Sequence, residues 1–225
     1  MSNLSVATKE PVNSTVLEVP FNDRERAKEL GAKWSSTLRK WFVPEGLSAA
    51  CALKLQEEWG NLFPGEDRTF GGNGLYVDLV PESCWFVNVR HCVSSSDWDK
   101  IRHRVYSRAN NQCEICGAIK DPSQKRWIEA HERWSYDDKK GVQKLMRLIA
   151  LCTDCHTVTH FGLATLRGLE DLAYRHLMEV TGMTYSEAKK HVREAFRIWS
   201  VRSVRLYELE LSLLEHAGVT IIPPS

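Results

Sequence analysis

Cys113-Glu-Ile-Cys116 and Cys152-Thr-Asp-Cys155 are the two stretches that decide how the middle of this chain folds. Each holds two cysteines separated by two residues, a spacing that lets one tight turn present both sulfurs to the same ion. Four thiolates are the ligand set that Zn²⁺ takes in closed, tetrahedral structural sites. The sequence therefore predicts a structural zinc site that joins two distant segments, with residues 117–151 folded between them.

Three histidines accompany these cysteines. His156 directly follows the last cysteine and His160 lies four residues later, so a helix that begins near Cys155 would present both on one face. His131 lies in the intervening segment, within a stretch that is typical of a short strand. If sulfur alone fills the zinc site, these imidazoles are free for other chemistry. A neutral imidazole is both a base near pH 7 and a common metal ligand.

This combination of two Cys-x-x-Cys pairs, a strand histidine and a histidine after the last cysteine resembles the HNH, or ββα-metal, nuclease family in its four-cysteine form. The resemblance implies an α+β fold, with a zinc-stapled, treble-clef-like ββα-metal core followed by C-terminal helices. It implies a metal-dependent endonuclease that hydrolyses phosphodiester bonds in nucleic acid, with double-stranded DNA as the first expectation. It also implies a catalytic Mg²⁺ or Mn²⁺ in addition to the structural Zn²⁺.

The family's roles can be transferred residue by residue. His131 would be the general base that activates water, and His156 would help to hold the catalytic ion, which stabilises charge on the phosphate and the leaving oxygen. His160 would be a further ligand, a phosphate contact or a structural residue of the helix. The predicted ligands of the structural zinc are Cys113, Cys116, Cys152 and Cys155.

Two positions depart from the family's pattern. The family usually has an acidic metal ligand just before the base histidine, where this chain has Ala130. Glu129 or Glu132 could replace it, although only Glu129 shares a strand face with His131 if the strand is regular. The family's asparagine before the third cysteine also has no counterpart, and Arg147 could hold a phosphate instead. These departures keep a rival function open, a catalytically inactive zinc module that binds nucleic acid or a protein partner.

A basic helix is predicted just before the first cysteine pair, over residues 98–108. The stretch Ser94-Ser-Ser-Asp97 offers an N-cap, and apolar residues recur at helical spacing on one face, while lysines and arginines occupy other positions. Contacts to a nucleic-acid backbone come chiefly from such side chains, although a merely solvated face fits equally well. The candidate nucleic-acid contacts are Arg102, Arg104, Arg108 and Arg147.

The domain organisation follows from composition. Residues 1–14 are polar and predicted to be a disordered tail, residues 15–62 a small α/β accessory domain, and residues 74–225 the zinc domain with its flanking helices. The Gly- and Pro-rich stretch between them is expected to be a loop or linker. Residues 15–46 resemble a small domain of mobile-element and DNA-primase-associated bacterial proteins, which implies an accessory role.

Two tryptophans of the accessory domain allow two interpretations. Trp34 and Trp41 lie among lysines and an arginine, as in platforms that bind single-stranded nucleic acid. The stronger interpretation makes them core residues, because a small domain has few other side chains to bury.

Further elements are predicted around the zinc region. Residues 75–81 and 84–90 are expected to be strands or extended segments, and residues 163–180 a helix. Thr184-Tyr-Ser-Glu187 is a capping box that begins another helix, in which His191 is expected to be a packing or surface residue, as is His176 in the helix before it.

Composition sets the remaining bounds. The 225 residues are 43% hydrophobic, enough for one or two packed domains, and the net charge of +1 gives no global signal for nucleic acid. The three other cysteines, Cys51, Cys84 and Cys92, are odd in number and irregularly spaced, which argues against a secreted disulfide scaffold. No signal peptide and no apolar run of ~18 residues is evident, so a soluble cytoplasmic protein is predicted. A homodimer would suit double-strand cleavage.

Overall fold

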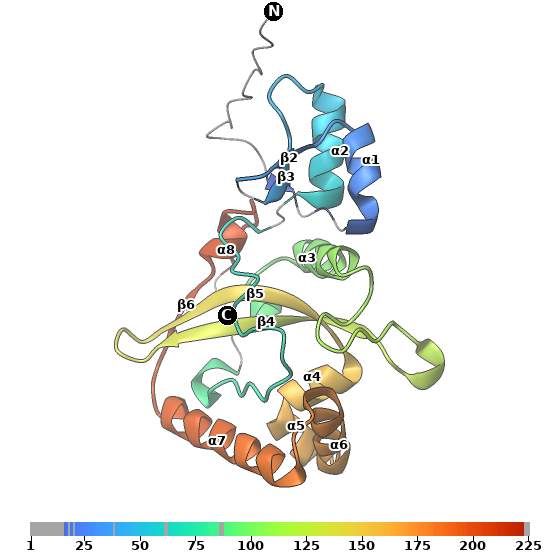
Figure 1. Ribbon diagram of the computed structural model, residues 1–225. Helices are drawn as coiled ribbons and strands as arrows, with labels where there is room; N and C mark the ends of the chain where they lie inside the picture. Colours follow the sequence, from blue (N-terminus) through green and yellow to red (C-terminus); the bar gives the residue numbers. More distant parts are fainter. Residues whose placement is uncertain are drawn as a thin grey trace, which may run out of the picture. The chain divides into compact units, whose positions relative to one another are not determined.

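The computed structural model describes residues 16–222, apart from positions 18, 20, 38, 61, 62, 86 and 87 and the side chain at position 57. The chain divides into two compact units, residues Met1–Leu62 and Phe63–Ser225. Both units mix helices with a small sheet, so the fold class is α+β (Figure 1). The predicted disordered tail lies outside the described residues.

The first unit is a three-stranded antiparallel sheet with helices beside it. Strand β3 lies in the centre, in the order β1-β3-β2. Helix α2 begins where the side chain of Ser48 accepts a hydrogen bond from the backbone N–H of Cys51. The elements are β1 (Val16–Leu17), a 3₁₀ turn (Phe21–Asp23), α1 (Arg24–Glu29), β2 (Lys33–Ser35), β3 (Lys40–Phe42) and α2 (Ala49–Trp59).

The tryptophans of this unit divide between core and surface. Trp59 is buried in the core and Trp41 packs against it, as the core interpretation expects. The side chain of Trp34 is 51% exposed, and its ring lies edge-on to that of Trp41 with centroids 5.6 Å apart. The core interpretation is therefore wrong for Trp34.

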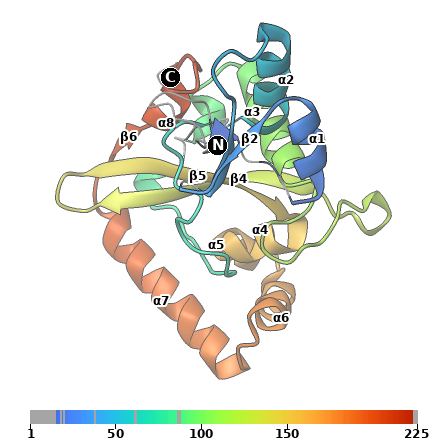
Figure 2. The ribbon, with the colours of Figure 1, turned by 45° about the horizontal axis from the view of Figure 1, so that its top comes forward.

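The second unit is built on a long hairpin. Strands β4 (Ile128–Asp137) and β5 (Val142–Cys152) pair antiparallel, and β6 (Glu208–Glu210) adds parallel to β5. Helix α3 (Ser95–Arg108) packs on one side of the hairpin, and α4 (Thr153–Thr159) and the next three helices lie on the other (Figures 1 and 2). Because both faces are covered, β5 is buried continuously from Arg147 to Cys152.

The helices after β5 are shorter than predicted. One helix was expected over residues 163–180, whereas α5 (Phe161–Leu166) and α6 (Glu170–Thr181) are separate. Gly168 adopts a left-handed φ of +70° between them, which ends the first helix. The predicted capping box is confirmed at the start of α7 (Tyr185–Ser203), where Thr184 and Glu187 each accept the other's backbone N–H. A short helix, α8 (Ser212–Glu215), follows β6.

Residues 75–81 and 84–90 were predicted to be strands or extended segments, and neither stretch forms a strand in its described residues. The first stretch is neither helix nor strand, and the second contains parts of two 3₁₀ turns, Glu82–Cys84 and Val89–His91. Two backbone N–H groups of the first stretch bond to helical segments. That of Val77 donates to Nε2 of His191 at 3.0 Å, and that of Asp78 to the carbonyl of Thr159 at 3.0 Å. In the described part of the chain, no helix is long and apolar enough to cross a membrane.

Candidate metal centres and the cavity beside them

The first cysteine pair lies on a tight turn that follows α3. Cys113 is buried, and its carbonyl accepts a hydrogen bond from the N–H of Gly117 at 2.9 Å. Gly117 has a φ of +75°, which explains why glycine follows the pair. Glu114, between the two cysteines, fixes this turn against β5. Its backbone N–H donates to the carbonyl of Ala150 at 2.9 Å, and its carboxylate accepts from the N–H of Ala150 at 2.7 Å.

The second pair lies where β5 meets α4. Cys152 caps the helix, since its Sγ accepts a hydrogen bond from the backbone N–H of Cys155 at 3.5 Å. The sulfurs of Cys116 and Cys152 are 3.6 Å apart, and the four cysteine sulfurs all lie within 4.8 Å of one another. Two sulfurs bound to tetrahedral zinc at ~2.3 Å lie roughly 3.8 Å apart. The four side chains are therefore close enough together to hold a metal ion such as Zn²⁺.

The electrostatics of these cysteines also suit a cation. Hydrogen bonds from Cys152 and Cys155 lower the pKa of Cys113, whereas hydrogen bonding to Cys113 raises the pKa of Cys152 to about 12. The thiols compete for ionisation because like charges in a buried cluster repel one another. A divalent cation removes this competition, since it favours the thiolate form of every ligand.

His176 is a neighbour of the cysteine cluster that the sequence did not reveal. Its Nε2 lies 3.2 Å from Sγ of Cys155, and its Nδ1 lies 3.9 Å from a carboxylate oxygen of Glu179. The contact arises because α6 packs on α4. The spacing of Cys155 and His176 in the sequence does not predict it. His191, which was expected like His176 to be a packing or surface residue, accepts the hydrogen bond from the backbone N–H of Val77 described above and so has a packing role.

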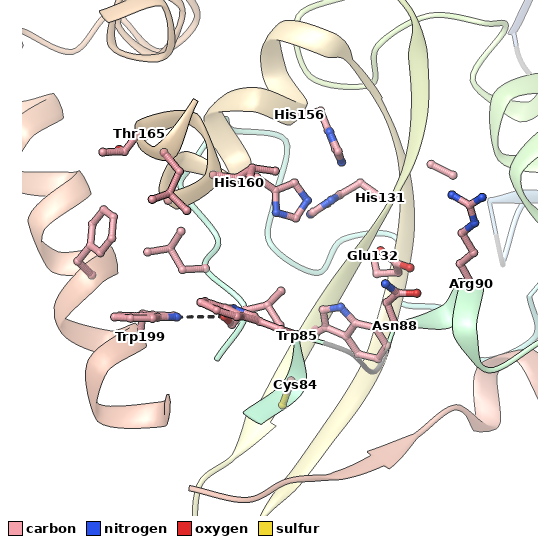
Figure 3. Close-up of a pocket in the computed structure, with 18 of the residues that line it drawn as sticks. Cys84, Trp85, Asn88, Arg90, His131, Glu132, His156, His160, Thr165 and Trp199 are labelled. Atoms are coloured by element: carbon pink, nitrogen blue, oxygen red, sulfur yellow. Dashed lines mark hydrogen bonds between the residues drawn. The ribbon is translucent and has the colours of Figure 1, made fainter. Parts of the chain in front are cut away.

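The three histidines that the sequence singled out beside the cysteines gather into a second cluster. His131 comes from β4, whereas His156 lies in α4 and His160 at its C-terminal end. One ring nitrogen from each histidine lies within 4.8 Å of one from each of the other two, and the ring centroids are 4.5 to 5.3 Å apart (Figure 3). The four-residue spacing predicts that the helical pair shares a face, and the hairpin brings the strand histidine to that face. The structure thus holds a group of imidazoles separate from the cysteine cluster.

All three imidazoles are held in the neutral form near pH 7. Burial lowers the pKa of His156 to about 4 and, together with His156, lowers that of His160 to about 3. Burial lowers the pKa of His131 well below its usual value, helped by the two other imidazoles and Arg133. The side chain of His131 is only 3% exposed, and neither ring nitrogen has a hydrogen-bond partner among the described residues. A buried polar group without a partner points to something absent from the chain itself, such as an ion or water.

The two glutamates considered as replacements for the missing acidic ligand lie differently. Glu129 Oε2 is 3.3 Å from Nδ1 of His156, and burial raises its pKa. Glu132 lines the same cavity as the histidines, and burial raises its pKa to about 7 (Figure 3). The group of side chains that could hold a metal ion here consists of the three histidines and includes neither glutamate. Ala130 has no side-chain donor atom.

A cavity of about 720 Å³ opens beside the histidine cluster, within the second unit. The three histidines lie on one side of it and the indoles of Trp85 and Trp199 on another (Figure 3). Its lining is mostly apolar. The polar residues Asn88, Arg90, Glu132 and Thr165 also reach it.

Arg108 and Arg147 do not line this cavity. The prediction that they contact nucleic acid is corrected, because both side chains are engaged in ion pairs within the unit. Nη2 of Arg108 donates to Glu66 at 2.9 Å, and Nη2 of Arg147 donates to Glu114 at 3.1 Å. Both arginines are largely buried, so their ion pairs hold the hairpin to the segments around it. A buried charge that lost such a partner would be costly, which commits both side chains to structure.

The other two candidate arginines remain at the surface of α3. Arg102 donates from Nε to Asp99 at 2.8 Å, an ion pair within the helix. Arg104 is exposed. Neither lines the cavity, so the structure does not bring them together with the histidines.

Comparison with known proteins adds one finding for the first unit. A family model described as "Domain of unknown function (DUF5710)" matches residues 14–53. The match covers less than half of the chain and carries no activity in its description. No curated protein and no solved structure matches the chain.

Proposed function

We propose that this chain is a metal-dependent endonuclease of the HNH type, which hydrolyses phosphodiester bonds in nucleic acid. The observation that carries the proposal is the cluster of His131, His156 and His160, each of which places one ring nitrogen within 4.8 Å of one from the others, beside a cavity. Phosphodiester hydrolysis needs a cation for the developing negative charge and a base for the attacking water. A neutral imidazole can hold the cation as a ligand, and it can accept the proton as a base.

The order of elements also supports an HNH-type core. Strand β4 carries His131, β5 returns antiparallel, and α4 follows with His156 directly after the last cysteine. The cysteine cluster lies where β5 meets α4, so it fixes the beginning of the helix that carries the other two histidines. The ββα-metal, treble-clef-like description of this segment is part of the proposal.

In this proposal His156 and His160 hold a divalent ion, and Glu129 orients His156. Because Nδ1 of His156 faces the Glu129 carboxylate at 3.3 Å, its Nε2 is left for the ion, as in other carboxylate–histidine–metal arrangements. Imidazole nitrogens suit a transition ion better than Mg²⁺, which prefers oxygen. When bound, the ion supplies positive charge that stabilises the phosphate and the leaving oxygen.

His131 takes the role of the general base. It is neutral near pH 7 and its nitrogens have no partner among the described residues, so a lone pair is available to accept a proton. As the water oxygen forms its bond to phosphorus, the imidazole removes a proton from that water. The bond from phosphorus to the leaving sugar oxygen then breaks.

The test compares His131→Ala with His103→Gln, a control that alters an exposed histidine of α3. Each protein is incubated with Mn²⁺ or Mg²⁺ and with plasmid DNA or RNA, and its bound metals are quantified. General-base catalysis typically contributes ~10²- to 10⁴-fold, so we expect His131→Ala to lose that much cleavage rate and keep the zinc of the cysteine cluster. The control should cleave like the parent protein.

Two results would change the assignment. If His131→Ala also loses the second ion, His131 is a ligand and the proton acceptor is another group. If parent and variant show the same background cleavage, the chain is a catalytically inactive zinc module, the rival that Ala130 and the structural arginines favour. Its function would then be to bind nucleic acid or a protein partner without cleavage.

A further inference from the structure

We infer that the cavity beside the histidine cluster receives a single unpaired nucleobase, so that the substrate is single-stranded or locally opened nucleic acid. This inference rests on the proposed nuclease function and narrows its substrate, since duplex DNA was the first expectation. It follows from the lining of the cavity, the fixed geometry of two indoles and the size of the space.

The lining of the cavity suits a flat apolar ring better than a sugar-phosphate backbone. Backbone contacts are made chiefly by arginines and lysines. The only such side chain that lines the described cavity is Arg90, whereas Trp85, Trp98, Trp134 and Trp199 all contribute indoles. Aromatic side chains are the usual partners of unpaired bases, because every base has a face on which they can stack.

Two of these indoles are fixed as one platform. The Nε1–H groups of Trp85 and Trp199 both donate to the carbonyl of Val80, at 2.8 and 3.1 Å. Their ring planes differ by only 20°, and their centroids are 6.3 Å apart. Trp85 is 52% exposed although it is held in this way, so an indole face is oriented before any ligand arrives. A preoriented ring loses little conformational freedom when a ligand stacks on it.

Three polar residues of the cavity lie together at one end, apart from Thr165. Figure 3 shows Asn88, Glu132 and Arg90 beyond Trp85, away from Trp199. An amide and a carboxyl group can donate to and accept from the edge of a base, which an apolar wall cannot do. Asn88 is oriented because its side-chain oxygen accepts from the N–H of His91 at 3.2 Å.

The size of the cavity excludes a paired base. Pockets of ~300–1,000 Å³ take ligands of small-molecule size, and the volume here is about 720 Å³. A base inside a duplex cannot enter such a space, so enzymes with base pockets act on single strands or extrude a nucleotide. The histidine cluster lines the same cavity. A base that stacks on the indole platform therefore brings its own phosphate close to the proposed catalytic imidazoles.

The test measures binding without added divalent metal, so it does not depend on cleavage. Fluorescence anisotropy compares a labelled single strand, the fully paired duplex of the same sequence, and a duplex with one unpaired nucleotide, in DNA and RNA forms. We expect the single strand and the bulged duplex to bind at least tenfold more tightly than the paired duplex. Trp85→Leu should weaken single-strand binding between about 5-fold and 150-fold, the usual worth of one stacked base.

Trp127→Leu is the matched control, because Trp127 is similarly exposed in the same unit but does not line the cavity. It should bind like the parent protein. Equal affinity for paired and unpaired substrates, or an unchanged affinity in Trp85→Leu, would overturn the inference. Cleavage of paired and unpaired DNA at equal rates would support the nuclease function and contradict the proposed base pocket. Tighter binding of unpaired bases without any cleavage would support the base pocket and contradict the nuclease function.

Discussion

The cysteine cluster and the histidine cluster share one helix, α4, yet their surroundings differ. Cys155 and His156 are neighbours in the chain, but Cys155 converges with three other cysteine sulfurs and His156 lines an open cavity. Four soft donors around one ion leave no position for a substrate, which is the pattern of a structural site. Three imidazoles beside a cavity leave room for water and a ligand, which is the pattern of a site that performs chemistry.

The comparison teaches that neighbouring donors are separated by the geometry of the helix start. Because Cys152 caps α4 and Cys155 lies in its first turn, the chain wraps the sulfurs around one point. His156 and His160 are one turn apart, so they leave the helix in another direction, where β4 adds His131. The following predictions test whether one cluster supports the fold and the other supports function.

The largest effect is expected from breaking the cysteine cluster. Cys155→Ser removes one thiolate, and structural zinc contributes much of the folding free energy of small zinc domains. We expect the free energy of unfolding of the second unit to fall by at least ~4 kcal/mol, with loss of the bound zinc. Urea denaturation followed by circular dichroism, together with metal analysis, measures both.

Cys92→Ser is the matched control, because Cys92 is equally buried in the same unit but lies outside the cluster. It should keep its zinc and lose only ~1 kcal/mol, the typical cost of a point substitution. If the two variants unfold alike, the cysteines pack as ordinary core residues and the contrast between the clusters fails.

An intermediate effect is expected from acid, and it comes from the histidine cluster. The folded chain holds His156 and His160 at pKa values of about 4 and 3, against ~6.5 for an ordinary histidine. Between pH 6.5 and 4 the unfolded chain therefore binds protons that the folded chain does not. Stability must fall as the pH is lowered through this window, by up to about 3 kcal/mol for one such histidine.

Urea denaturation of the parent protein and His160→Gln at pH 7.5, 6.0 and 5.0 measures this effect. Glutamine does not titrate, so the variant should lose less stability on acidification, while both proteins share whatever the cysteines contribute. His103→Gln, which alters an exposed histidine, should follow the parent protein. Parallel curves for the parent protein and His160→Gln would mean that His160 is protonated in the folded state and is not held neutral.

The sequence revealed the parts of both clusters that depend on short-range spacing. Two residues between cysteines and four between helix histidines determine which side chains share a turn or a face, whatever the rest of the chain does. The capping box at Thr184 is equally local, and it too was predictable. The placement of His131 beside the helical pair came from a family resemblance, because strand pairing brings distant segments together.

What the sequence could not reveal depends on partners far away in the chain. The sequence alone predicts that Arg108 and Arg147 are surface cations. In the structure they pair with Glu66 and Glu114, which lie far away in the sequence. Residues 75–81 have the composition of a strand, yet the N–H groups of Val77 and Asp78 bond to helical segments that lie far away in the sequence. The platform of Trp85 and Trp199 likewise joins a loop and α7 through a single carbonyl.

The smallest effect is expected where a histidine supports the sulfur cluster. Nε2 of His176 lies 3.2 Å from Sγ of Cys155, so a ring N–H there can stabilise the thiolate without binding the ion. Loss of such an outer partner typically weakens metal binding ~10- to 100-fold, and we expect His176→Gln to do so with the fold retained. Competition with a chromophoric chelator measures the affinity, with His103→Gln as the control. An affinity equal to that of the parent protein would show that the His176 contact is packing alone, whereas complete loss of the ion would make His176 a ligand and end the separation of sulfur from imidazole.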